Sequence, residues 1–194
     1  MGEAGAVIEA PAAPRRRDAA ATRAAILEAA KTQFALLGYD RAALRDIAGA
    51  AGADVALIKR YFGGKEALFT EALRAAFRPR FADWDRASFP REMATMMADG
   101  VGADDERTAS FQFLLRAATS PSTAPLLGLA MQEKFLGPIR EWLGGDEAAP
   151  RARVLAAVFI GLLVERLIRG GRLSGPEREL FIEETASVLE TLIR

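Results

Sequence analysis

The stretch 47-IAGAAGADVALIKRYFGGKEALF-69 contains two short helical patterns separated by a glycine turn. Gly52 favours the end of the first helix, and Asp54 suits the cap of the second because its carboxylate can accept a hydrogen bond from a free backbone N–H. Within the second helix, Ile58 and Phe62 lie one turn apart and therefore share an inward face. The order of helix, glycine turn and capped short helix predicts a helix-turn-helix motif.

The outward side of the second helix is cationic and phenolic, because Lys59, Arg60 and Tyr61 lie between the two apolar anchors. In a helix-turn-helix protein, this helix enters the major groove of DNA. Lysine and arginine neutralise phosphates or donate to guanine, and a tyrosine hydroxyl suits a phosphate oxygen. A solvated charged face on an ordinary helix pair is the alternative interpretation.

Charge is distributed unevenly along the chain, although its formal net charge is zero. Residues 15–65 hold ten basic and five acidic side chains, whereas the remainder holds sixteen basic and twenty-one acidic ones. A basic segment on an acidic body is typical of a protein that binds a polyanion. Residues 1–20 lack apolar periodicity, so we expect a flexible basic arm there and a DNA-binding domain over residues 21–67.

Apolar residues recur at helical spacing along most of the chain. Ile26, Ala30, Phe34 and Leu37 share one face, and Gly38 then favours the end of that helix. Residues 80–104 are ambiguous, because Pro90 interrupts them although Met93, Met96 and Met97 lie at helical spacing. Further helices are expected over about 106–119, 123–143, 150–170 and 176–193. Because no alternating strand pattern of useful length and no internal repeat is present, the sequence predicts an all-α fold.

Cysteine and histidine are both absent. Disulfides and nucleophile systems based on Ser-His-Asp or Cys-His are therefore excluded, and a zinc site would lack its usual nitrogen and sulfur ligands. The sequence also contains no Gly-rich phosphate loop and no paired-carboxylate motif. We therefore expect no cofactor, no metal and no catalytic activity, and a helical enzyme that uses carboxylates is a remote alternative.

The longest uncharged apolar run, 154-VLAAVFIGLLV-164, has eleven residues, which is too short to cross a bilayer. The N-terminus has no compact apolar segment followed by a cleavage site. Together with the absence of cysteine, these features predict a cytoplasmic protein that has no membrane partner.

Residues 22–69 resemble the N-terminal domain of TetR-type transcriptional regulators. The matching segments are 24-AAILEAAKTQFALLGY-39, 45-RDIAGAAG-52 and 58-IKRYFGGKEALF-69, in the order and spacing of that family. The resemblance implies a three-helix DNA-binding domain followed by a helical ligand-binding and dimerisation domain over residues 68–194.

The resemblance also implies which residues meet DNA. Arg45 would reach bases or backbone from the start of the second helix, and Lys65 would contact a phosphate at the start of the fourth. The recognition surface would comprise Val55, Ala56, Leu57, Lys59, Arg60 and Tyr61. The sequence departs from the family at Ala42-Ala43, where a Thr pair is common, and at Gly64, where Ser, Asp or Asn is common, and both departures weaken helix capping.

Two C-terminal helices are expected to form a homodimer. The segment 154-VLAAVFIGLLVERLI-168 is apolar nearly all round, so one face packs within the subunit and another requires a partner. A C₂ pair would place two recognition helices roughly 34–36 Å apart, one turn of DNA, which predicts a palindromic operator. The alternative is that these helices bury all their apolar surface within one subunit.

The resemblance implies a small-molecule pocket in the C-terminal domain, and methionines and aromatic residues suit an adaptable apolar pocket. Arg116 is the candidate anchor for an anionic group. The other candidates are Met93, Met96, Met97, Phe111, Leu114, Leu115, Met131, Phe135 and Trp142, all of which could equally belong to an ordinary helical core. The predicted function is that of a repressor released from its operator by a small, largely apolar effector. The alternative is a DNA-binding regulator without an inducer, acting architecturally or through a protein partner.

Overall fold

The computed structural model describes residues 15–77, 84–99 and 106–194, and all regular structure in these ranges is helical. The N-terminal helices, which we call the head, are α1 (Arg15–Arg41), α2 (Leu44–Ala50), α3 (Val55–Phe62) and α4 (Lys65–Ala76). The remainder, which we call the body, consists of α5 (Phe89–Ala98), α6 (Glu106–Thr119), α7 (Ala124–Met131), a π-helical turn (Gln132–Leu136), α8 (Gly137–Leu143), α9 (Ala148–Arg169) and α10 (Gly175–Ile193). The predicted all-α fold is confirmed.

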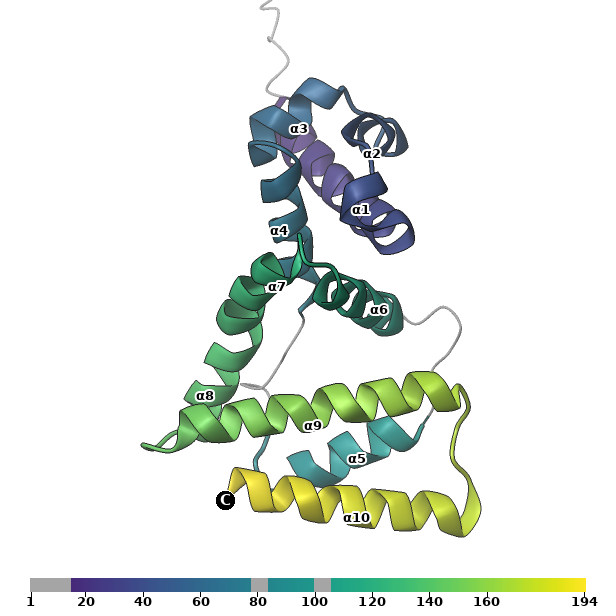
Figure 1. The fold of residues 1–194 in the computed structure, drawn as a ribbon, viewed down its shortest axis with the longest axis vertical. Helices are drawn as coiled ribbons and strands as arrows, with labels where there is room; N and C mark the ends of the chain where they lie inside the picture. The colour runs from purple at the N-terminus through teal and green to yellow at the C-terminus, as the bar shows by residue number, and fades with distance from the viewer. Residues whose placement is uncertain (1–14, 78–83, 100–105) are drawn as a thin grey trace, which may run out of the picture.

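The head and most of the body lie at opposite ends of an elongated molecule (Figure 1). Helices α5, α9 and α10 form the layer farthest from the head, and α5 packs along α10 within it. Helices α6 and α7 lie between this layer and the head, where α6 contacts α1 and α7 contacts α4. The head therefore meets the body through α1 and α4.

The core of the head forms where the apolar faces of α1 to α4 meet. Ile26 and Phe34 from α1 are buried together with Ile47 from α2 and Ile58 and Phe62 from α3, as the sequence predicts. Residues of α4 as far as Ala76 belong to the same core, which thus extends beyond residue 67, where the sequence places the domain boundary.

Helix α1 is longer than the sequence predicts at both ends. It begins at Arg15, so residues 15–20, which were expected to form part of a flexible arm, are helical. The alanine-rich sequence at residues 19–25 explains this difference, because alanine has the highest helix propensity. Gly38 does interrupt the helix, with φ 77° and ψ 169°, but one further helical turn follows it as far as Arg41. Residues 1–14 of the expected arm lie outside the described residues.

The helix expected over residues 123–143 is divided by the π-helical turn. In this turn the backbone N–H of Gly137 donates to the carbonyl of Gln132, five residues earlier. Pro138 follows directly, and it explains the irregularity because proline has no N–H and its ring collides with the carbonyl four residues before it in a regular α-helix. Widening the turn at this point removes that collision and lets the helix continue into α8.

The core of the body lies between α5, α8, α9 and α10. Met93 and Met97 of α5 are buried there with Leu155 and Phe159 of α9 and Leu189 of α10. Helix α5 occupies part of the segment in which the sequence is ambiguous, and a proline in its first turn is compatible with helix initiation. Within the described residues, no helix is both long enough and apolar enough to span a membrane.

Replacing Phe62 with alanine tests the head core. We expect the free energy of unfolding to fall by about 3–5 kcal/mol, because the change leaves a cavity beneath α3. Urea denaturation at one fixed protein concentration measures the loss. Leu36→Ala is the control, since Leu36 is 64% exposed and its truncation should change stability by no more than about 0.5 kcal/mol. Equal stabilities for the two variants would contradict the burial of Phe62.

Candidate nucleic-acid interface

A side-chain cap and two glycines mark the two ends of α3. The carboxylate of Asp54 accepts a hydrogen bond from the backbone N–H of Ala56 at 2.7 Å, as its position in the sequence predicts. Gly52 has φ 63° in the turn, and Gly63 has φ 90° at the end of α3, both in the left-handed region that favours glycine. These features fix where α3 begins and ends.

Helix α3 lies near the end of the molecule farthest from α10 (Figure 1). Its polar side is exposed. Ile58 and Phe62 are buried, so the rest of the helix is left at the surface. Val55, Ala56, Lys59 and Arg60 are exposed, whereas Leu57 and Tyr61 are half-buried against the head core. The guanidinium of Arg60 lies 5.9 Å from the centre of the Tyr61 ring. Of the six predicted recognition residues, four are thus exposed and two are half-buried.

Arg45 is exposed on the first turn of α2. Among the described residues, it forms no ion pair with a carboxylate. The N-cap of α2 is Ala43, which provides no side-chain hydrogen bond. The first turn of α2 therefore presents a cation beside uncapped backbone N–H groups.

Lys65, another predicted DNA contact, is half-buried and contacts the end of α1. Its Nζ donates to the carbonyl of Asp40 at 3.3 Å and lies 4.7 Å from the centre of the Tyr39 ring. Burial, followed by the negative charges of Glu66 and Asp40, raises the pKa of Tyr39, so its phenol stays neutral at physiological pH. Lys65 thus links the start of α4 to the end of α1.

Arg23 supports the interface, although nothing in the sequence singles it out. Its guanidinium lies 4.5 Å from the centre of the Phe62 ring and pairs with Glu71 of α4. It therefore covers the anchor of α3 and joins α1 to α4. The contact depends on packing between segments far apart in the chain, so no local pattern could have revealed it.

Two family models match the chain. The model described as bacterial regulatory proteins, tetR family, matches residues 26–72, and the model described as tetracyclin repressor-like, C-terminal domain, matches residues 87–193. The second match alone covers more than half of the chain. The chain belongs to the TetR family. It is a DNA-binding transcriptional regulator and not an enzyme, because the proteins that it matches are regulators.

Three known proteins are similar to this TetR-family regulator in sequence or in fold. The HTH-type transcriptional regulator BetI of Agrobacterium fabrum is 27% identical over 174 residues, which span 84% of each chain. The crystal structure of NalD, the secondary repressor of the MexAB-OprM multidrug efflux pump in Pseudomonas aeruginosa, is 20% identical with a TM-score of 0.59, covering 87% of this chain and 95% of NalD. The multidrug binding protein EbrR, crystallised with malachite green, is 22% identical with a TM-score of 0.62, covering 93% of this chain and 99% of EbrR. At these identities the two structures show a shared fold.

The predicted ligand residues of this TetR-family regulator lie in two different places. Most of them, namely Met93, Met96, Met97, Met131, Phe135 and Trp142, belong to the core of the body or pack against it. Phe111, Leu114, Leu115 and Arg116 instead lie on α6. Arg116 is exposed, and its guanidinium donates to the carbonyl of Leu36 in the head at 2.9 Å. Arg116 therefore lies apart from the methionines and contacts the head, and its role as an anchor for an anionic ligand stays a prediction.

Two pockets in the described part of this regulator lie near the predicted ligand residues. The larger, of about 620 Å³, lies between α5 and α9 and is lined by Ala87, Ser88, Arg91, Glu92, Thr95, Met96, Asp99 and Arg166. The smaller, of about 290 Å³, lies between the end of α1 and α6 and includes Arg116 in its wall. Of the predicted ligand residues, Met96 alone lines the larger cavity. Polar and charged residues outnumber apolar ones in its wall, although most of the lining surface is apolar.

Proposed function

We propose that this regulator binds a palindromic operator as a homodimer and is released by a small-molecule effector. The observation that carries the proposal is the outward surface of α3. This surface presents exposed cations and apolar side chains, and the turn that precedes it is capped. In this arrangement Lys59 and Arg60 contact phosphates or guanine edges, and Val55 and Ala56 contact thymine methyl groups. Arg45, Tyr61 and Lys65 supply phosphate contacts around this centre, while Leu57 packs at its edge.

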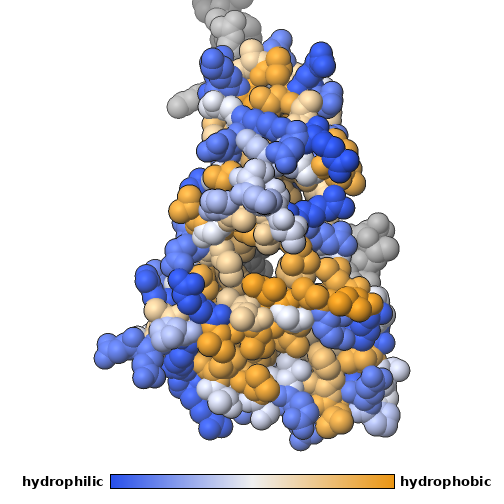
Figure 2. All heavy atoms as spheres, in the orientation of Figure 1, coloured by the Kyte–Doolittle hydropathy of each residue, from blue (hydrophilic) through white to orange (hydrophobic). Residues whose placement is uncertain are grey.

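An apolar stripe along α9 supports the dimer. Val154, Ala157, Gly161, Val164 and Ile168 recur at alternating spacings of three and four residues, which places them on one face of the helix. Val154 is 49% exposed and Ile168 is 82% exposed, so this face is not buried within the subunit. Leu180 and Val188 of α10 are also exposed, and Figure 2 shows apolar side chains gathered over α9 and α10. A second copy of the chain would cover this surface.

The cavity between α5 and α9 supports an effector. Its volume exceeds the lower limit of about 300 Å³ for ordinary ligand sites. The similar protein EbrR has been crystallised with malachite green and with proflavin, and its fold is shared along nearly the whole chain. These observations favour an effector-responsive regulator over one that acts without an inducer.

Selection of bound duplexes from random sequence tests the proposed operator. We expect the purified chain to enrich an inverted repeat whose half-sites are centred about one helical turn, 10–10.5 base pairs, or a multiple of it apart. Sequencing of the selected pool measures both the repeat and its spacing. Enrichment of a single unrepeated half-site, or of no sequence, would exclude the symmetric mode of binding.

The salt dependence of binding to the selected duplex tests the cations of α3. Replacing Lys59 or Arg60 with alanine should weaken binding and reduce the slope of log K against log salt by about 0.9 for each phosphate that is no longer neutralised. Fluorescence anisotropy over a salt series measures both quantities. Arg172→Ala, an exposed change in the loop before α10, is the matched control and should alter neither. If either variant behaves like this control, the residue that it replaces does not contact DNA.

A charge placed in the stripe tests the dimer. Gly161→Glu should convert the dimer to a monomer, because it places two carboxylates in the apolar interface. The subunit itself should remain folded, since a Cβ at this position meets nothing within 4 Å. Analytical ultracentrifugation measures the mass, and Ala149→Glu on an exposed position of the same helix is the control. A Gly161→Glu chain that stays dimeric would place the interface elsewhere.

A further inference from the structure

Helices α6 and α7 belong to the apolar core of the head. Phe113 and Ala117 of α6 and Ala130 of α7 are buried in the same cluster as Phe34 and Phe69 of the head. Partly buried leucines of both helices pack against this cluster as well, namely Leu114, Leu126 and Leu127. The core of the head therefore extends into two helices of the body.

Aromatic and polar contacts join the same helices to the head. The ring centres of Phe69 in α4 and Phe113 in α6 are 5.5 Å apart in an edge-to-face arrangement. On the other side of α6, the guanidinium of Arg116 donates to the carbonyl of Leu36 in α1 at 2.9 Å. Within the described ranges, neither α6 nor α7 packs extensively on α5, α8, α9 or α10. We call the head together with α6 and α7 the first unit.

The helices α5, α8, α9 and α10 form a second unit with a core of its own. Met97 of α5, Ile139 of α8, Leu155 of α9 and Leu189 of α10 are buried together in this core. The first and second units therefore exclude water from two separate apolar clusters.

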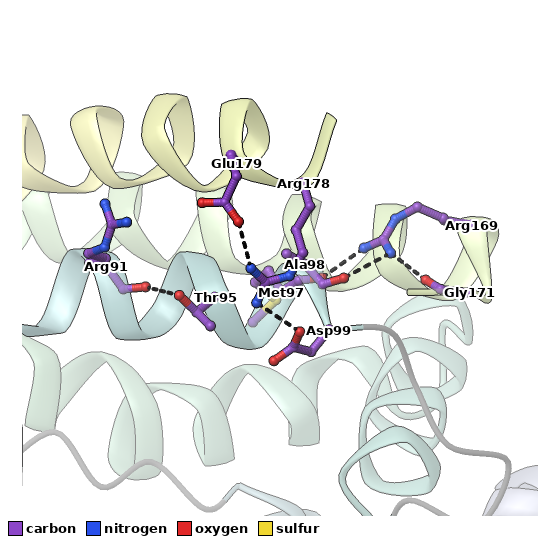
Figure 3. A network of polar contacts seen from close by, with 9 residues as sticks. All are labelled: Arg91, Thr95, Met97, Ala98, Asp99, Arg169, Gly171, Arg178 and Glu179. Atoms are coloured by element: carbon purple, nitrogen blue, oxygen red, sulfur yellow. Dashed lines mark hydrogen bonds and ion pairs between the residues drawn. The ribbon is translucent and has the colours of Figure 1, made fainter. Parts of the chain in front are cut away.

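Two arginines fasten the end of α5 within the second unit (Figure 3). Arg169 of α9 donates to the carbonyl of Met97 at 2.7 Å, and Arg178 of α10 pairs with Asp99 at 3.1 Å. Because the two arginines come from different helices, α5, α9 and α10 are tied together at this point. The second unit is thus held by polar contacts as well as by its core.

The π-helical turn is where the two units meet in the described part of the chain. Phe135 of this turn lies between them, since its ring centre is 5.9 Å from that of Phe77 at the end of α4 and 6.4 Å from that of Phe159 in α9. On the side of the head, Arg74 of α4 pairs with Glu133 of the turn at 2.8 Å. The turn therefore contacts α4 in the first unit and α9 in the second.

The chain passes between the two units in three places. Two of them, residues 78–83 and 100–105, lie outside the described residues. The third is the π-helical turn, in which the N–H of Gly137 bonds to the carbonyl five residues earlier. Pro138 follows the turn directly. Prolines and π-helical turns are the usual places at which helices bend, and here the two occur together.

We propose that the first unit pivots as one body about the π-helical turn, and that this hinge determines which half-site spacings the dimer can bind. Two compact units move relative to one another unless a large apolar interface holds them. Here each unit has its own core, and the apolar contact between them in the described residues runs through Phe135. The pivot redirects each head and leaves its recognition surface intact. The spacing rests on the proposed function, whereas the pivot does not.

Distances between spin labels test the pivot. The chain contains no cysteine, so labels attach only where a cysteine is introduced. One pair, Ala24→Cys with Ala118→Cys, lies in the first unit, and a second, Ala149→Cys with Glu177→Cys, lies in the second unit. A third pair, Ala24→Cys with Ala149→Cys, spans the turn, and all four positions are exposed. Double electron–electron resonance measures each distance distribution, with labelled chain diluted in unlabelled chain so that each distance arises within one subunit.

We expect the spanning pair to give a broader distribution than either pair within a unit, because only its labels lie on opposite sides of the hinge. A spanning pair as narrow as the other two would show that the units move together, and the proposal would be overturned. A first-unit pair as broad as the spanning pair would place the flexible point between the head and α6, which also overturns it.

Straightening the turn tests whether it is the hinge. Deleting Lys134 shortens the five-residue separation to the four residues of a regular α-helix, and Pro138→Ala removes the ring that would collide with the preceding turn. The spanning distribution should then narrow to the width found within a unit. Pro176→Ala, in the first turn of α10, is the control and should change nothing. A straightened chain that folds by circular dichroism but keeps the broad distribution overturns this hinge; if it does not fold, the three label pairs decide.

Duplexes of altered spacing separate the hinge from the proposed function. Moving the selected half-sites apart by one base pair adds about 3.4 Å. By fluorescence anisotropy, the straightened chain should lose at least about tenfold more affinity at the longer spacing than the unaltered chain, since about 1.4 kcal/mol of added deformation already costs tenfold. Equal losses overturn the control of spacing, and the pivot is then decided by the labels. A chain that binds no duplex loses the proposed function, while the distance distributions still decide the hinge.

Discussion

The burial of Ile58 and Phe62 against the head core fixes the rotation of α3, and the outward direction of every proposed DNA contact on that helix depends on it. Because the two side chains lie one turn apart, a single rotation of the helix removes both from water. Arg23 covers Phe62 from α1 and is itself paired with Glu71 of α4. The recognition surface is therefore positioned by apolar packing, and its cations need no partners within the protein to point outward.

Sequence reasoning succeeded where the signal was local. The cap at Asp54 lies within two residues of the N–H whose hydrogen bond it accepts, so spacing alone predicts it. It could not find the contacts of Arg23 with Glu71 or of Lys65 with Asp40, because these pairs are 48 and 25 residues apart and meet through the packing of α1 on α4. In the body, spacing located the helices other than α5, but not the side chains that line a cavity, since that depends on which helices become neighbours.

Arg116 and Arg166 illustrate this second limit. Both are arginines on helices of the body, and of the two the sequence analysis singled out only Arg116, as the candidate anchor for an anionic group. The structure directs Arg116 to the carbonyl of Leu36 and buries Arg166 beside α5. One signal was present, however, because Arg166 interrupts the apolar segment 154–168, and a charge inside such a segment is costly unless the fold provides for it.

Helix α9 lies between the core of the body and the proposed dimer interface. Its inner side carries Arg166, and its outer side carries Val164 and Ile168, which are two residues away in either direction. An effector alters DNA affinity only if it binds the two arrangements of the dimer unequally. An effector that shifted the inner side of α9 would move the stripe on its outer side with it, because a helix is rigid over one turn. In the proposed dimer, that stripe would help to set the separation of the two heads.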